Sequence, residues 1–129
     1  MATIQRFEDL EIWQTAREIC RDMNSVTGKK YFSRDFTLVD QIRRSSGSAM
    51  DNIAEGFERD GNKEFIQFLS ISKGSIGETR SQLYRALDFK YIEQEEFGTL
   101  SEKCIKLSRQ LQKFSDYLRN TSIKGRKFQ

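Results

Sequence analysis

The sequence contains no histidine, and this absence removes most catalytic and metal-binding chemistry. An imidazole is the base of Ser-His-Asp and Cys-His systems, a ligand in HExxH zinc sites and part of the Glu-x-x-His motif of di-iron bundles. Two cysteines cannot form a four-thiolate zinc site, and the chain has no GxxxxGK[ST] or GxGxxG loop. We therefore expect no catalytic residue, no metal, no cofactor and a protein that is not an enzyme.

Proline is absent as well, and glycine is limited to eight positions. Because proline breaks helix interiors most strongly, long uninterrupted helices are permitted along the whole chain. Charged residues make up 32% of the sequence, above the usual 25% or so, which is typical of long helices with solvated faces. A chain of 129 residues predicts one domain, residues 1–129, that buries roughly 68% of its unfolded surface.

Long apolar runs are also missing. No segment approaches the roughly 20 apolar residues that cross a bilayer, and Met1 to Arg6 lacks the apolar part of a secretory signal. We therefore expect a cytoplasmic protein with no membrane partner.

Cys20 and Cys104 lie far apart in apolar helical stripes, so we interpret them as two small buried side chains rather than a disulfide.

Helical periodicity is the main signal that the chain does carry. Apolar or small residues recur at steps of three and four over residues 10–26, 39–53, 65–87 and 97–118. We expect the first helix to begin at residues 7–9 and to end at Gly28, followed by a basic and aromatic loop over residues 29–35. Glu55 and Gly56 close the second helix or begin its last turn, and Asn62 is a suitable N-cap for the third. Residues 88–92 form the last connection.

These four stripes predict an all-α, antiparallel, up-down-up-down four-helix bundle. The alternative is a long parallel coiled coil, which is disfavoured because each stripe is short and is followed by a chain reversal. Within the second helix, residues 45–49 are all small and allow another helix to approach closely. A phosphate-binding loop is the alternative there, but the run lies inside helical periodicity.

A second group of polar residues lies on the second and third helices. Asn52 and Glu55, with Ser75 and Glu78, are predicted to form a structural polar cluster between these helices or to cap the turn at residues 56–61. The alternative is an acid/base pair of Asp51 and Glu55, which share a helix face.

Charge is distributed unevenly along the chain. Residues 1–102 hold 14 Lys and Arg against 18 Asp and Glu, whereas residues 103–129 hold eight Lys and Arg against Asp116 alone, a balance of +7. Lys106, Arg109 and Lys113 fall on one stripe opposite the apolar seam, with Lys103 beside it. The candidate nucleic-acid-binding residues are Lys103, Lys106, Arg109, Lys113, Arg119, Lys124, Arg126 and Lys127. The alternative is a solvated helix face, with Glu102 pairing to Lys106, followed by a basic, disordered tail over residues 121–129.

Five short motifs occur in order along the chain. They are Phe7-x-x-Leu10-x-x-Trp13, Gln41-Ile42-Arg43-Arg44, Asn52-Ile53-Ala54-Glu55-Gly56, Glu64-Phe65-x-x-Phe68-Leu69, and Gly74-Ser75 with Glu78. Together they closely resemble the bacterial four-helix bundle family of 23S rRNA intervening-sequence proteins, over residues 7–118. The resemblance is looser at residues 48–51 than elsewhere, so no role is assigned to that segment.

The resemblance implies a small protein, often encoded within 23S ribosomal RNA genes, whose relatives assemble as homopentamers. It also implies a distant relationship to the accessory variability determinant protein of diversity-generating retroelements, which engages nucleic acid and a reverse transcriptase. The aromatic residues Phe32, Phe36, Phe65 and Trp13 suggest independently that one bundle has more aromatic surface than it buries, which is typical of an oligomer interface.

Two functional hypotheses follow. The first is a homo-oligomeric protein that binds nucleic acid, RNA in particular, through its basic C-terminal helix and tail. The second is a scaffold that docks a protein partner such as a polymerase and makes no direct contact with nucleic acid. Binding to membrane surfaces is disfavoured, because the fourth helix has no exposed apolar face.

Overall fold

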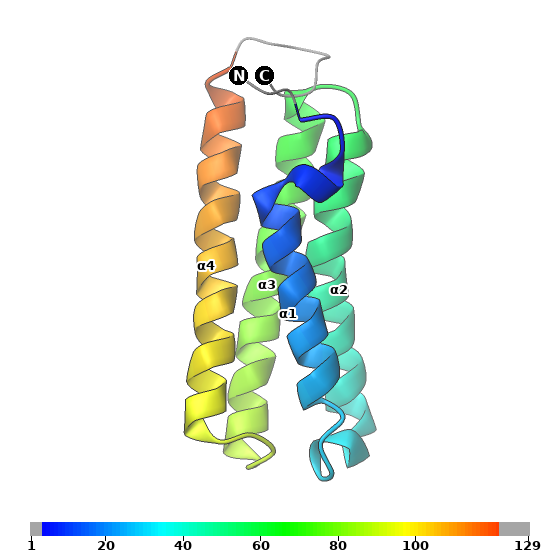
Figure 1. The fold of residues 1–129 in the computed structure, drawn as a ribbon, viewed down its shortest axis with the longest axis vertical. Helices are drawn as coiled ribbons and strands as arrows, with labels where there is room; N and C mark the ends of the chain where they lie inside the picture. Colours follow the sequence, from blue (N-terminus) through cyan, green and yellow to red (C-terminus); the bar gives the residue numbers. More distant parts are fainter. Residues whose placement is uncertain (1–3, 122–129) are drawn as a thin grey trace.

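The computed structural model describes residues 4–121, and within them the chain is an all-α four-helix bundle. The helices are α1 (Glu11–Val26), α2 (Phe36–Glu58), α3 (Asn62–Asp88) and α4 (Gln94–Arg119), with the short 3-10 turns η1 (Phe7–Asp9) and η2 (Phe32–Arg34). Successive helices run in opposite directions, as Figure 1 shows, so the predicted up-down-up-down fold is confirmed. The end of the bundle that carries the α1–α2 and α3–α4 connections is called the loop end below.

The start of α1 differs from the sequence-based prediction. Residues 7–9, expected to open the first helix, form the separate turn η1, because Leu10 has an extended backbone (φ −76°, ψ 127°) and caps α1. Leu10 itself is buried in the core. The helix therefore begins at Glu11, and it ends just before Thr27 and Gly28.

The connection between α1 and α2 is better packed than the loop we predicted. Phe32 lies in η2, is fully buried, and stacks on Tyr91 with ring centroids 5.2 Å apart. The Tyr91 hydroxyl donates to Asp35 Oδ2 at 2.9 Å, while Asp35 Oδ1 accepts from the backbone N–H of Leu38 at 3.1 Å and caps α2. These contacts join the two connections at the loop end.

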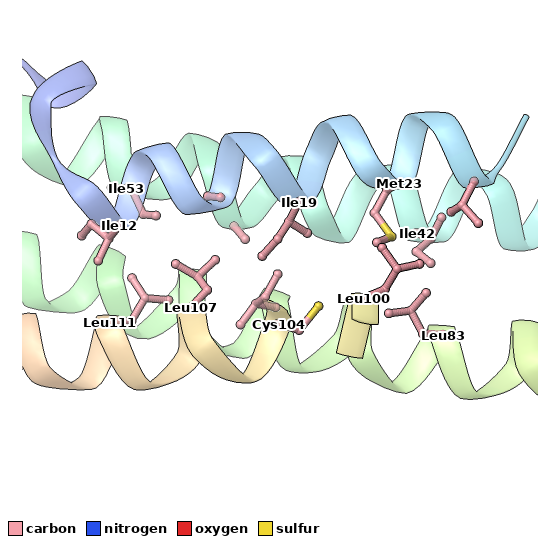
Figure 2. Close-up of a cluster of buried hydrophobic side chains, with 14 of the residues drawn as sticks. Ile12, Ile19, Met23, Ile42, Ile53, Leu83, Leu100, Cys104, Leu107 and Leu111 are labelled. Atoms are coloured by element: carbon pink, nitrogen blue, oxygen red, sulfur yellow. The ribbon is translucent and has the colours of Figure 1, made fainter. Parts of the chain in front are cut away.

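The core lies along the bundle axis and receives side chains from all four helices (Figure 2). The heptad seam predicted for α4 is confirmed: Phe97, Leu100, Cys104, Leu107, Leu111 and Leu118 are buried and Phe114 is partly buried. Each fully buried large apolar side chain contributes about 1.5–3 kcal/mol relative to exposure. Cys20 is only half-buried, with its Sγ donating to the Ser46 carbonyl at 3.2 Å, and both cysteines are free thiols.

Gly56 lies where α2 packs tightly against Phe65 and Phe68 of α3. Gly56 was predicted to close the second helix or to begin its last turn, and it lies in the last turn of α2, which ends at Glu58. A Cβ at this position would lie 2.7 Å from Phe68 Cβ and 2.8 Å from Phe65 Cδ1. Glycine is therefore required here for contact between two helices rather than for helix termination.

Hydroxyl groups also form hydrogen bonds between α2 and α3. Ser45 Oγ lies 2.7 Å from Thr79 Oγ1 and donates to Gln82 Oε1 at 2.7 Å, and all three residues are buried. Nearby, Ser72 Oγ donates to the Ala49 carbonyl at 2.7 Å. The small residues of α2 thus admit a close neighbour, as predicted, and that neighbour is α3.

Asn62 does not cap α3 as the sequence suggested. The cap is Gly61, whose φ of 82° favours glycine, and Asn62 is the first residue of the helix. Its side-chain amide donates instead to the Leu118 carbonyl at 3.1 Å, joining the start of α3 to the end of α4. At its other end, α3 closes with Lys90 in the left-handed region (φ 64°).

Two of the aromatic residues predicted to exceed the capacity of the core are buried within the single chain. Phe32 and Phe65 are both buried, and Trp13 is partly buried against Phe7, with ring centroids 5.2 Å apart. The bundle holds more aromatic surface than composition suggested because η1 and η2 add packed turns at its ends. Phe36 remains 81% exposed.

Candidate nucleic-acid interface

The outer face of α4 carries the central part of the predicted basic stripe. Lys106, Arg109 and Lys113 are exposed, on the side of α4 opposite Leu107 and Leu111. Within residues 4–121, none of these three cations forms an ion pair. Their charge is therefore available to an external anion.

Lys103, predicted as part of the same stripe, instead bridges α4 to α1. Its Nζ lies 2.7 Å from Asp22 Oδ2 and 3.9 Å from Glu18 Oε1, and its side chain is 31% exposed. The hydrogen bond to Asp22 raises the pKa of Lys103, so the ammonium is charged at neutral pH but is compensated by carboxylates. Sequence reasoning placed it correctly beside the stripe and missed α1 as its partner.

The remaining predicted basic residues lie at the end of α4 or beyond it. Arg119 is in the last turn of α4, where its Nη1 lies 3.1 Å from Asp116 Oδ1. Lys124, Arg126 and Lys127 lie outside the described residues.

The groove between α1 and α4 has mixed charge. A hollow of about 400 Å³ there is lined by Arg17, Arg21 and Lys106 together with Glu11 and Glu18. The two carboxylates offset much of the cationic field, so this side is a weaker anion site than the outer face.

The groove between α3 and α4 is more positive. A hollow of about 310 Å³ is lined by Arg80 and Gly77 of α3 and by Cys104, Ser108 and Arg109 of α4. Burial raises the pKa of Cys104 to about 12, while the Arg80 cation acts in the opposite direction. The thiol is therefore neutral, and it adds no negative charge to the floor of this hollow.

Arg80 was missed by sequence reasoning. It is an isolated cation in α3, and the charge asymmetry that drew attention to α4 says nothing about a single arginine elsewhere. The available signal was its spacing of three from Gly77, which places both on one edge of the helix.

The predicted polar cluster is only partly assembled. Asn52 Nδ2 donates to Ser48 Oγ at 3.0 Å, and Ser48 Oγ lies 2.9 Å from Ser75 Oγ. Glu55 instead pairs with Arg59, at 2.7 Å. Glu78 is exposed in a hollow between α2 and α3.

Exposed aromatic rings gather at the loop end. Tyr31 is 62% exposed, Phe36 81% and Phe89 54%, and we call these three the loop-end aromatic surface. Lys30 Nζ and Arg34 Cζ lie 5.5 and 5.4 Å from the Tyr31 ring centroid. These cation–π contacts stabilise each ring–cation pair by about 0.5–1 kcal/mol at an exposed site.

Within residues 4–121, no group of three or more His, Cys, Asp or Glu side chains is arranged to hold a metal ion. None of the helices in this part of the chain is both long enough and apolar enough to cross a membrane.

Comparisons with known proteins agree with this architecture. A solved structure with the same fold, from a protein of unknown function of the S23 ribosomal protein family in Bacteroides thetaiotaomicron, superposes with a TM-score of 0.74 at 22% identity. The match covers 81% of this chain and 97% of that chain. No curated protein matches the sequence. The family model described as 23S rRNA-intervening sequence protein matches residues 8–113 and names no enzymatic activity. The chain therefore belongs to the 23S rRNA-intervening sequence protein family.

Proposed function

We propose that this protein is a non-enzymatic, homo-oligomeric binder of nucleic acid, RNA in particular, that contacts phosphates through the outer face of α4 and the basic residues after it. The observation that carries the proposal is the set of unpaired, exposed cations Lys106, Arg109 and Lys113 on one face of a rigid helix. Cations of this kind release counterions when they neutralise phosphates, which supplies sequence-independent affinity.

The asymmetry of charge along α4 supports the same function. The first turn of α4 is acidic, with Glu95 and Glu96, and the unpaired cations follow from the middle of the helix onward. Favourable interaction with the helix dipole accounts for charges in the terminal turns only, since the effect fades within one turn. Lys106 and Arg109 lie well inside the helix, so their placement has no such local cause.

Self-association is part of the proposal. The family resemblance suggests a homopentamer, and a closed ring would multiply the basic faces and strengthen attraction for a polyanion. Exposed apolar side chains such as Phe36 and Ile71, which is 50% exposed, are available for such contacts. Sedimentation at micromolar concentration tests this directly: a 15.1 kDa monomer would refute the oligomer.

The test of nucleic-acid binding compares two triple variants of equal charge. We expect the affinity for an unstructured single-stranded RNA to fall steeply with salt, and K106Q/R109Q/K113Q to reduce the log–log salt slope by about 2. The matched control, K30Q/R34Q/K90Q, removes three cations at the loop end and should leave most of the affinity intact. RNA binding that is independent of salt, or equal losses in the two variants, would contradict the proposal.

A second candidate function is a scaffold for a protein partner. The loop-end aromatic surface favours it, because solvent-exposed aromatic rings beside cations are enriched at protein interfaces. Purification after nuclease treatment separates the two candidates. The scaffold is favoured if a polypeptide is retained by the wild type but lost by the Phe36→Ser variant, and if RNA is not bound at low salt.

A further inference from the structure

The hollow between α3 and α4 has three features that no other described hollow combines: two cations from different helices, no acidic lining residue, and no ion pair at either cation. Arg80 and Arg109 enter it from different helices, and none of its lining residues is acidic. Within the described residues, neither arginine forms an ion pair. Two uncompensated guanidinium groups beside one concave surface repel each other unless an anion lies between them.

The other described hollows lack this arrangement. Those between α1 and α4 contain Glu11, and the one between α2 and α3 contains Glu78. The hollow at the start of α3 contains Lys63 and Arg119, but Arg119 is already paired with Asp116. Among the described hollows, the α3–α4 hollow is thus the one in which two cations from different helices both lack an ion pair and no lining residue is acidic.

The shape of the hollow allows an anion to come close. Gly77 forms part of its wall, and a Cβ added there would meet nothing within 4 Å. A side chain at this position would therefore project into open space that a ligand could use. Ser108 adds a hydroxyl donor on the opposite helix. The floor is formed by Ile76 and the neutral thiol of Cys104, both buried.

We propose that this hollow is a phosphate-binding site in which Arg80 and Arg109 bind the phosphate oxygens, Ser108 donates a hydrogen bond and the bare backbone at Gly77 makes room for the anion. Guanidinium groups suit this role because their planar forks match phosphate oxygens. The inference deepens the proposed function, since a phosphodiester of nucleic acid is one source of the phosphate. A free phosphate or phosphomonoester is the other source.

The first experiment titrates inorganic phosphate into the wild-type protein and follows arginine Nε–Hε and backbone amide resonances by NMR. We expect the signals of Arg80, Arg109 and Gly77 to shift saturably, and chloride at the same ionic strength to leave them unchanged. Arg85, in the same helix but hydrogen-bonded to Gln41, is the internal control. Shifts at Arg80 and Arg109 no larger than those at Arg85 would overturn the inference, whatever RNA does.

Two variants test the site by different means. Arg80→Gln removes one cation, and Gly77→Leu fills the hollow without changing charge; the helix accommodates leucine because nothing packs against Gly77. Both should abolish the saturable phosphate shifts while far-UV circular dichroism remains that of the wild type. Retention of the shifts in folded Gly77→Leu would refute the placement of the anion.

An RNA titration then identifies the source of the phosphate. We expect Arg80→Gln to weaken binding of single-stranded RNA about fivefold, and the control Arg85→Gln, with the same change in charge, less than about twofold. Phosphate shifts without any RNA binding would leave the site standing as one for free phosphate and would refute the proposed function alone. Equal RNA losses in the two variants would exclude the phosphodiester as its ligand.

Discussion

Replacing Gly56 by alanine tests the close contact of α2 with α3. The added Cβ would lie 2.7 Å from Phe68 Cβ and 2.8 Å from Phe65 Cδ1. Phe68 Cβ is attached directly to the backbone, so it moves only if α3 moves. Overpacking of this kind costs about 1–3 kcal/mol, while the gain in helix propensity from glycine to alanine is about 1 kcal/mol. We therefore expect Gly56→Ala to lower the free energy of unfolding by up to about 2 kcal/mol.

Gly77→Ala is the matched control. It makes the same substitution in the interior of a helix, but the new Cβ meets nothing within 4 Å. Propensity then acts alone and should stabilise the protein by about 0.5–1 kcal/mol. Relative to the wild type, the free energy of unfolding should therefore fall in Gly56→Ala and rise in Gly77→Ala. The two variants should differ from each other by about 2 kcal/mol.

Urea unfolding followed by circular dichroism at 222 nm measures both variants. With a slope of about 2 kcal/mol per molar urea, Gly56→Ala should lower the midpoint by up to about 1 M and Gly77→Ala should raise it by about 0.3–0.5 M. Protein concentration must be the same throughout, because self-association shifts apparent stability. A midpoint for Gly56→Ala equal to or above that of Gly77→Ala would refute the reasoning that steric contact at Gly56 limits the approach of the helices.

Three further outcomes are expected. Ser45→Ala should lower the free energy of unfolding in urea by about 1–3 kcal/mol, because the buried side chains of Thr79 and Gln82 each lose a hydrogen bond. No change in this free energy would show that water replaces the lost hydroxyl between α2 and α3. Asp22→Asn should cost about 1 kcal/mol at neutral pH. Because the pKa of Lys103 is raised in the folded state, the stability it adds is present below its ordinary value of about 10.5 and is lost as the pH rises above that, so wild type and variant should converge there. A difference that stays constant as the pH rises through the titration of Lys103 would contradict this. Thiol labelling followed by mass spectrometry should modify the half-buried Cys20 before Cys104, whose thiol is buried and has its pKa raised to about 12; faster labelling of Cys104 would contradict its burial.

The helices and their buried faces could be predicted because periodicity is a local property of the sequence. The heptad seam of α4 needs only spacing of three and four, and the structure buries those positions. Gly56 could not be understood in this way, since its role depends on the rings of another helix. Phe32 was assigned to a loop because its partner Tyr91 lies in a distant connection.

The candidate site was predicted less completely than the fold. Exposure of Lys106 and Arg109 follows from the position of the seam on their own helix. The pairing of Lys103 with Asp22, and the fact that Arg80 and Arg109 line the same hollow, depend on which helices are neighbours and at what height they meet. One-dimensional charge counts contain neither quantity, so they located the basic helix without identifying its partners.

The hydrogen bonds between hydroxyl-bearing residues of α2 and α3 favour one register of the two helices. Sliding one helix by a turn, about 5.4 Å, would separate Ser45 from Thr79 and Gln82 and break the hydrogen bonds between them. The helices therefore keep a fixed position relative to one another along the bundle. With its 26 residues, α4 extends about 39 Å, slightly more than the 34–36 Å of one turn of duplex DNA. A partner lying along it would meet charges whose spacing does not adjust, and would have to match that spacing itself.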